Sequence, residues 1–195
     1  MEDTITTYHT GRIQWGAITA GTIFALALSL VLLQFGAVIG LSATEPYSVE
    51  PEVATWGVVV SGLWILWVQV ISSLSGGYIA GRFRQVAPLH TPHESEMRDG
   101  LAGLLSWASA TVLVMIGLGV SSAFAGIADA MINGPVSDDI LTEGERNTAI
   151  IFAFITGATS IVSAAAAWWA GTVGGDHRDQ GTDFSTHFSF RTIKK

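Results

Sequence analysis

The first apolar stretch of the chain reads WGAITAGTIFALALSLVLLQFGAVIGL, from Trp15 to Leu41, and it contains no charged residue. Three similar charge-free stretches follow, at residues 56–81, 100–126 and 149–175. Each has 26 or 27 residues, which at about 1.5 Å per residue is enough to cross roughly 30 Å of hydrocarbon with some tilt. The four stretches therefore predict four transmembrane helices.

The overall composition leads to the same fold class. Of the 195 residues, 49% are hydrophobic and 13% are charged, whereas a soluble domain carries about 25% charged residues. A transmembrane β-barrel would alternate apolar and polar residues, but runs such as Ile23–Leu28 are continuously apolar. The expected fold class is all-α integral membrane. The flank Met1-Glu2-Asp3 is acidic, so the first stretch is expected to be a retained span and not a cleaved signal.

The basic residues predict the orientation. They fall on the two sides of the predicted membrane as eight against one: Arg12, Arg82, Arg84, Arg98, Arg178, Arg191, Lys194 and Lys195 on one side, and Arg146 on the other. Because arginine and lysine collect on the cytoplasmic side, both termini are expected in the cytoplasm (N-in/C-in). The opposite loops hold eight acids and one base, so the outer face carries the net charge of −7.

The expected organisation is a pair of transmembrane hairpins. A cytoplasmic segment, 1–14, precedes the first hairpin, 15–81; a cytoplasmic linker, 82–99, leads to the second hairpin, 100–175, and a cytoplasmic tail, 176–195, follows. Small residues near the ends of the two hairpins recur 94 positions apart, as do Arg84 and Arg178. This spacing is typical of a parallel duplication. Thr91-Pro92-His93-Glu94 has the pattern of a helix N-cap, so a helix is expected to start there and continue into the third span.

Three short motifs carry a resemblance to a family. They are Arg12–Ala17, Gly76–Arg82, and Asp99-Gly100 with the later Trp107-Ala108. With these motifs the chain resembles a group of small four-span bacterial inner-membrane proteins that has no established activity. The resemblance covers most of the chain and implies the topology and a bacterial inner membrane. It transfers no site residues.

Small residues at four-residue spacing occur in every span. The clearest pairs are Gly36 with Gly40, Gly77 with Gly81, Gly117 with Ser121, and Gly171 with Gly175. Lipid gives helices no hydrophobic reason to associate, so close backbone approach at small residues has to hold them together. These residues are predicted to pack helices, either within one bundle or against another chain.

Two long polar side chains lie inside the apolar stretches, Gln34 and Gln69. They are expected to bond between helices, with a polar path through an oligomer as the alternative. On the outer side, four acids form a predicted acidic face: Asp138, Asp139, Glu143 and Glu145. This face either docks a basic protein or consists of ordinary exposed loop residues that bind nothing.

Catalytic and cofactor chemistry has little support in the sequence. The four stretches contain no acid, base or histidine, and proton relays and ion-coupled carriers need such groups. The chain has no cysteine, which excludes disulfides and iron–sulfur clusters. His90, His93, Glu94 and Glu96 cluster in the linker, but they are expected to be solvated and not to hold a metal. No catalytic residue, cofactor or metal is therefore predicted, and the expected bound molecule is lipid.

The sequence leaves two functional hypotheses. The first is a non-enzymatic structural or accessory subunit of a larger membrane complex, which would bind other subunits or itself through small-residue helix faces. The alternative is a passive pore or small-solute channel formed by an oligomer. Nucleic-acid binding is not expected, because the cytoplasmic side is neutral overall.

Overall fold

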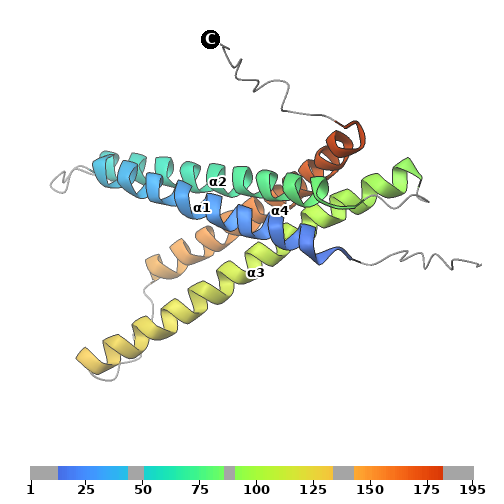
Figure 1. Ribbon diagram of the computed structural model, residues 1–195. Helices are drawn as coiled ribbons and strands as arrows, with labels where there is room; N and C mark the ends of the chain where they lie inside the picture. The colour runs from blue at the N-terminus through green and yellow to red at the C-terminus, as the bar shows by residue number, and fades with distance from the viewer. Residues whose placement is uncertain (1–12, 44–50, 86–90, 134–142, 182–195) are drawn as a thin grey trace, which may run out of the picture.

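The structure, a computed structural model, describes residues 13–43, 51–85, 91–133 and 143–181 (Figure 1). These residues form four α-helices: α1, Trp15–Ala43; α2, Pro51–Arg82; α3, Pro92–Asn133; and α4, Glu143–Asp179. Each contains one of the charge-free stretches and extends beyond it. The expectation of an all-helical chain with four helices long and apolar enough to cross a membrane is confirmed.

The longest helix is α3, with 42 residues, or about 63 Å at the usual rise. Its first turn is capped as the sequence predicts. The Thr91 hydroxyl accepts a hydrogen bond from the backbone N–H of Glu94 at 3.3 Å, and an N-cap of this kind satisfies an N–H group that the helix itself leaves unpaired. The cap starts α3 eight residues before its apolar stretch, so Asp99 becomes part of the helix.

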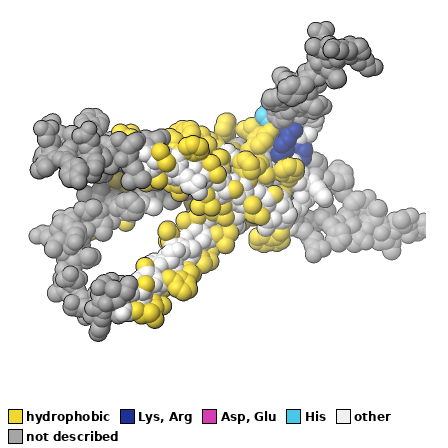
Figure 2. All heavy atoms as spheres, turned by 60° about the vertical axis from the view of Figure 1, so that its left-hand side comes forward, with side chains coloured by type: hydrophobic (Ala, Val, Ile, Leu, Met, Phe, Trp, Pro, Cys, Tyr) yellow, Lys and Arg dark blue, Asp and Glu magenta, His cyan; other side chains and the backbone are white. Residues whose placement is uncertain are grey.

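The helices form two hairpins, α1–α2 and α3–α4, which cross each other (Figure 1). We call the end of the molecule near Arg82 and Asp179 the linker end, and the end near Ala43 and Asn133 the turn end. Helix α2 packs against α1, α3 and α4, and α1 also touches α3, whereas α1 and α4 do not meet within the described residues. The two hairpins lie together near the linker end and separate toward the turn end (Figures 1 and 2).

The tightly packed part of the molecule is built mostly from small residues. Its buried apolar side chains are largely alanines, among them Ala80, Ala102 and Ala167, with Ile18 as the largest fully buried apolar side chain. Small side chains let helix backbones approach each other closely. By contrast, every residue of α3 from 112 to 128 is exposed. The packing that positions a site therefore lies at the linker end.

Candidate functional site: a buried ion network beside a small-residue helix crossing

A single carboxylate, that of Asp99, joins three helices at the linker end. Asp99 is only 2% exposed, although it lies on α3 next to an apolar stretch. One of its oxygens accepts from Arg84 Nε and from the guanidinium of Arg178 at 3.1 Å, and the other accepts from Arg178 at 3.0 Å. We call Arg84, Ser95, Asp99 and Arg178 the clamp.

The two arginines also satisfy backbone groups of the neighbouring helices. Arg178 donates to the carbonyl oxygens of Gly81 and Arg84, both at 2.9 Å. These carbonyls lie at and just beyond the C-terminus of α2, where the helix leaves its last carbonyls short of partners, and the Gly81 carbonyl also accepts from the N–H of Arg84 at 3.4 Å. Arg84 donates to the carbonyl and the hydroxyl of Ser95, at 3.2 and 3.1 Å. The clamp thus ties the end of α2, the start of α3 and the end of α4 to one another.

The charges of this network balance locally. Asp99 lies between two arginines, and Arg178 makes a second ion pair with the partly exposed Asp179 at 2.8 Å. Two arginines and two carboxylates sum to zero. Removing one member of such a buried network costs about 3–5 kcal/mol, because the remaining charge stays buried without compensation. The pair Glu94–Arg98, at 2.8 Å and 45% and 32% exposed, is worth about 0.3–0.5 kcal/mol.

A crossing of small residues lies directly beside the clamp. A Cβ atom added at Gly77 or Gly81 of α2 would come within 3.0 Å of the backbone of Ala167 or Gly171 of α4. A Cβ on Gly103 of α3 would meet Ala167 at the same short range. Backbone thus touches backbone where α2, α3 and α4 meet. We call Gly77, Gly81, Gly103, Ala167 and Gly171 the small-residue crossing.

Gly175 joins the crossing to the clamp. A side chain on Gly175 would collide with the carboxylate of Asp99, so Asp99 fits against α4 only because position 175 has no side chain. The predicted pairs Gly77/Gly81 and Gly171/Gly175 therefore lie on the two helices that face each other here.

On the turn-end side of the crossing, a small polar network joins the same three helices. Ser163 of α4 is fully buried and accepts a hydrogen bond from the indole N–H of Trp107 of α3 at 3.0 Å. The amide nitrogen of Gln69 of α2 approaches the same hydroxyl at 3.5 Å. Gln69 is thus half-buried at a contact between helices, whereas Gln34 is exposed on α1.

The two helices of the first hairpin are also joined farther from the linker end. A Cβ atom at Gly36 would overlap the indole of Trp64, and this indole donates its N–H to the carbonyl of Leu32 at 3.1 Å. Trp64 from α2 therefore fills the notch that Gly36 leaves in α1. The surroundings of Gly40, the predicted partner of Gly36, lie outside the described part of the structure.

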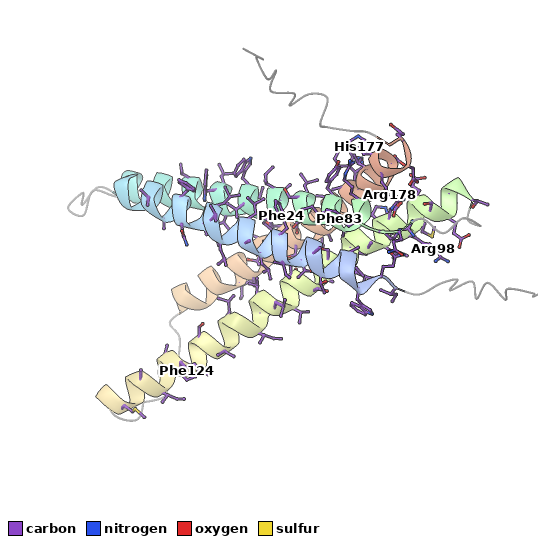
Figure 3. All side chains as sticks on the ribbon, in the orientation of Figure 1. Phe24, Phe83, Arg98, Phe124, His177 and Arg178 are labelled. Carbon is purple, nitrogen blue, oxygen red and sulfur yellow. The ribbon has the colours of Figure 1, made fainter. Side chains whose placement is uncertain are left out.

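The glycines in the turn-end halves of α3 and α4 have no such neighbours. A Cβ atom at Gly117, Gly119, Gly126 or Gly157 would meet nothing within 4 Å. Ser121, the predicted partner of Gly117, is exposed and donates its hydroxyl to the Gly117 carbonyl at 2.8 Å. The Phe124 side chain, 69% exposed, lies on this free part of α3 (Figure 3). The structure does not bring Gly117 and Ser121 against another helix of the same chain.

The predicted acidic outer face has no described side chain. Asp138 and Asp139 lie outside the described residues, as do the side chains of Glu143 and Glu145 at the start of α4. His177 at the end of α4 meets the hydroxyl of Tyr78 at 3.2 Å, and Arg82 donates to the same hydroxyl at 3.3 Å (Figure 3). In the described ranges no three acids or histidines are grouped as metal ligands.

A shallow hollow of about 450 Å³ lies at the linker end between α1 and the end of α2. Its lining consists of small apolar residues, one aromatic ring and two amides: Gln14, Gly16, Ala17, Ala20, Phe83 and Gln85. The side chain of Gln14 bonds both the N–H and the carbonyl of Gln85, at 2.6 and 3.2 Å. The hollow therefore contains no acid or base, and its amides serve to attach α1 to α2.

Asp99, the residue at the centre of the clamp, was not predicted from the sequence. It lies at the edge of the predicted linker, and the eight basic residues of that side indicated an orientation but no individual partner. One signal could have revealed the network: Arg84 and Arg178 are 94 positions apart, and in the structure both bond the single acid that immediately precedes the third apolar stretch.

Fold and site together define a multi-pass membrane protein whose four helices are joined by a buried ion network and a small-residue crossing. In comparisons with protein families, curated proteins and solved structures, nothing matches this chain. The resemblance to small four-span bacterial proteins therefore stays a prediction.

Proposed function

We propose that the protein is a non-enzymatic structural or accessory subunit that binds other membrane proteins, or further copies of itself, through the turn-end halves of α3 and α4. One observation carries this proposal. The glycines of the small-residue crossing each meet a neighbouring backbone, while Gly117, Gly119, Gly126 and Gly157 meet nothing within 4 Å. Glycine notches are a common basis of helix association in lipid.

The packing of the first hairpin supports the same conclusion. There, a large side chain from α2 fills the notch at Gly36, so a helix glycine of this chain can receive a neighbouring helix. Glycine inside a helix costs up to about 1 kcal/mol relative to alanine. Gly117, Gly119, Gly126 and Gly157, which receive nothing in the described part of the chain, are explained if another chain packs against them.

The orientation belongs to this proposal. The linker end would face the cytoplasm of a bacterial cell and the turn end the outside, because eight of the nine lysines and arginines belong to the linker-end side. Figure 2 shows lysine and arginine side chains gathered at this end of the visible face, next to a histidine. The two hairpins would be products of a duplication, since Gln69 approaches Ser163 and Arg178 bonds the carbonyl of Arg84, each pair 94 positions apart.

The passive pore has less support than the subunit. Of the two glutamines that could line it, Gln69 lies at a packed contact between α2 and α4, and Gln34 is exposed on α1 beyond the crossing. The described contacts do not bring the two side chains together. We therefore do not put the pore forward as a second function.

Association measured on the intact chain tests the proposal. Gly117→Leu fills an open notch on α3, and Gly62→Leu is its matched control, because Gly62 of α2 is equally open. We expect Gly117→Leu to weaken capture of partner subunits or of a differently tagged copy in mild detergent about tenfold, equivalent to about 1.4 kcal/mol. The control should leave capture unchanged. Equal capture by the wild type and both variants, or a monomer with no partner in any of them, would overturn the proposal.

A further inference from the structure

The two hairpins differ in how far from the linker end their own two helices stay in contact with each other. Trp64 fills the Gly36 notch well toward the turn end and ties α1 to α2 there. In α3 and α4, the described close contacts run from Asp99 to the Ser163 network and stop there. Beyond that point every α3 residue from 112 to 128 is exposed. The first hairpin is thus held together over more of its length than the second, which meets it at the linker end.

The contact between the hairpins has the properties of a pivot. At the crossing of α2 with α4, glycine and alanine backbones touch, and the described side-chain contacts between these helices, Tyr78 with His177 and Gln69 with Ser163, lie on either side of it. Smooth contacts of this type permit one packed element to turn on another more readily than interlocked side chains do. The angle between the hairpins must therefore be set by groups outside the crossing.

The clamp is the charged group among them. Asp99 on α3 holds Arg84 from the first hairpin and Arg178 from the second, and the same Arg178 holds two carbonyls at the end of α2. All of these bonds lie on the linker-end side of the crossing, and their geometry fixes how α4 is placed relative to α2. Without the carboxylate, the buried Arg84 and the partly buried Arg178 would face each other as two positive charges.

We propose that the clamp and the small-residue crossing form a hinge, in which Asp99 locks the angle between the hairpins. Release of Asp99 from the arginines lets the second hairpin turn about the crossing and changes the separation of the turn ends. This inference goes beyond the proposed association and does not depend on it. It assigns Asp99 a conformational role that a structural salt bridge on the surface, such as Glu94–Arg98, does not have.

A small turn at the hinge gives a measurable displacement, because the turn-end half of α3 lies far from the crossing. Leu118 on α3 is 15 residues beyond Gly103 of the crossing, or about 22 Å at the helical rise. A turn of about 10° at the crossing therefore moves Leu118 by about 4 Å relative to the first hairpin. A change of this size is within the range of distance measurements between paired spin labels.

The test uses the full chain in a lipid bilayer. The sequence has no cysteine, so spin labels attach only at cysteines that are introduced by substitution. A pair at Leu33 of α1 and Leu118 of α3, both exposed, measures the angle between hairpins. A pair at Leu33 and Val60 of α2 stays within the first hairpin and reports whether that hairpin remains intact. Asp99→Asn opens the clamp, and Glu94→Gln removes an acid from the exposed pair as the matched control.

In Asp99→Asn, the mean Leu33–Leu118 distance should shift by about 4 Å or more and its distribution should broaden, while the Leu33–Val60 distance stays as in the wild type. Glu94→Gln should change neither. Arg178→Gln is the second variant, and it should shift the Leu33–Leu118 distance while leaving one arginine on Asp99. Unchanged Leu33–Leu118 distances in both clamp variants would overturn the hinge. Loss of the Leu33–Val60 distance would also overturn it, because the first hairpin would then depend on the clamp.

Discussion

Replacing Gly81 with alanine tests whether the small-residue crossing holds the helices together. The added Cβ would lie under 3.0 Å from three backbone atoms of Gly171, whereas carbon atoms pack at about 3.5 Å or more. The nearest of these atoms is the Gly171 carbonyl oxygen, so the backbones of α2 and α4 would have to separate by more than about 1 Å, a gap that forfeits about half of the local dispersion energy.

The cost follows from two contributions. Overpacking of a tight contact costs about 1–3 kcal/mol. The same separation lengthens the 2.9 Å bond from Arg178 to the Gly81 carbonyl, and hydrogen bonds to charged groups are worth about 1.5–3 kcal/mol when lost completely. With this bond weakened and not abolished, we expect Gly81→Ala to lower the free energy of unfolding by about 2–4 kcal/mol.

The assay is reversible unfolding in mixed micelles, followed by the fluorescence of the seven tryptophans. Gly117→Ala is the matched control, since its Cβ meets nothing within 4 Å and alanine favours a helix over glycine by up to about 1 kcal/mol. The control should be unchanged or slightly stabilised, so the two substitutions should differ in sign. Equal effects of Gly81→Ala and Gly117→Ala would refute the argument that the crossing depends on backbone contact.

Two further predictions concern buried polar contacts. Trp64→Phe removes the hydrogen bond to the Leu32 carbonyl but keeps an aromatic ring in the notch, so it should lower the free energy of unfolding by about 1 kcal/mol. Trp64→Ala also empties the notch and should lower it by about 3–5 kcal/mol. Trp169→Ala, at a 62% exposed position, should cost far less, and a similar loss at both tryptophans would contradict the packing described for Trp64. Ser163→Ala takes the acceptor from the Trp107 indole and should cost about 0.6–1.7 kcal/mol, with a change in Trp107 fluorescence; an unaltered spectrum would show that the bond does not form.

The four helices could be predicted from the sequence because a bilayer imposes a simple rule. Backbone polar groups have no water to bond in the hydrocarbon, and charged side chains are costly there, so long charge-free stretches become helices. The start of α3 at Pro92 also followed from the Thr91 cap. These features depend on neighbours within a few residues, which the sequence displays directly.

The clamp could not be predicted in the same way, because burial of Asp99 depends on partners far away in the chain. Its arginines lie 15 and 79 positions away, and the acid can be buried only where Gly175 leaves room for it. The spacing of the glycines likewise predicted only part of the packing. It marks one face of a helix but not the neighbour of that face, so Gly36 meets a tryptophan, Gly81 meets a backbone and Gly117 meets nothing in the described structure.

The most direct test of the account is the position of the two ends of the molecule relative to a membrane. Gln85, exposed at the linker end, and Glu50, which directly precedes α2 in the sequence, are each replaced by cysteine in separate variants, so that each variant has a single cysteine. A thiol reagent that cannot cross membranes is then added to intact bacterial cells whose outer envelope has been opened. The account predicts labelling of Glu50→Cys at once and of Gln85→Cys only after the inner membrane is permeabilised. Labelling of both cysteines from the same side would contradict it.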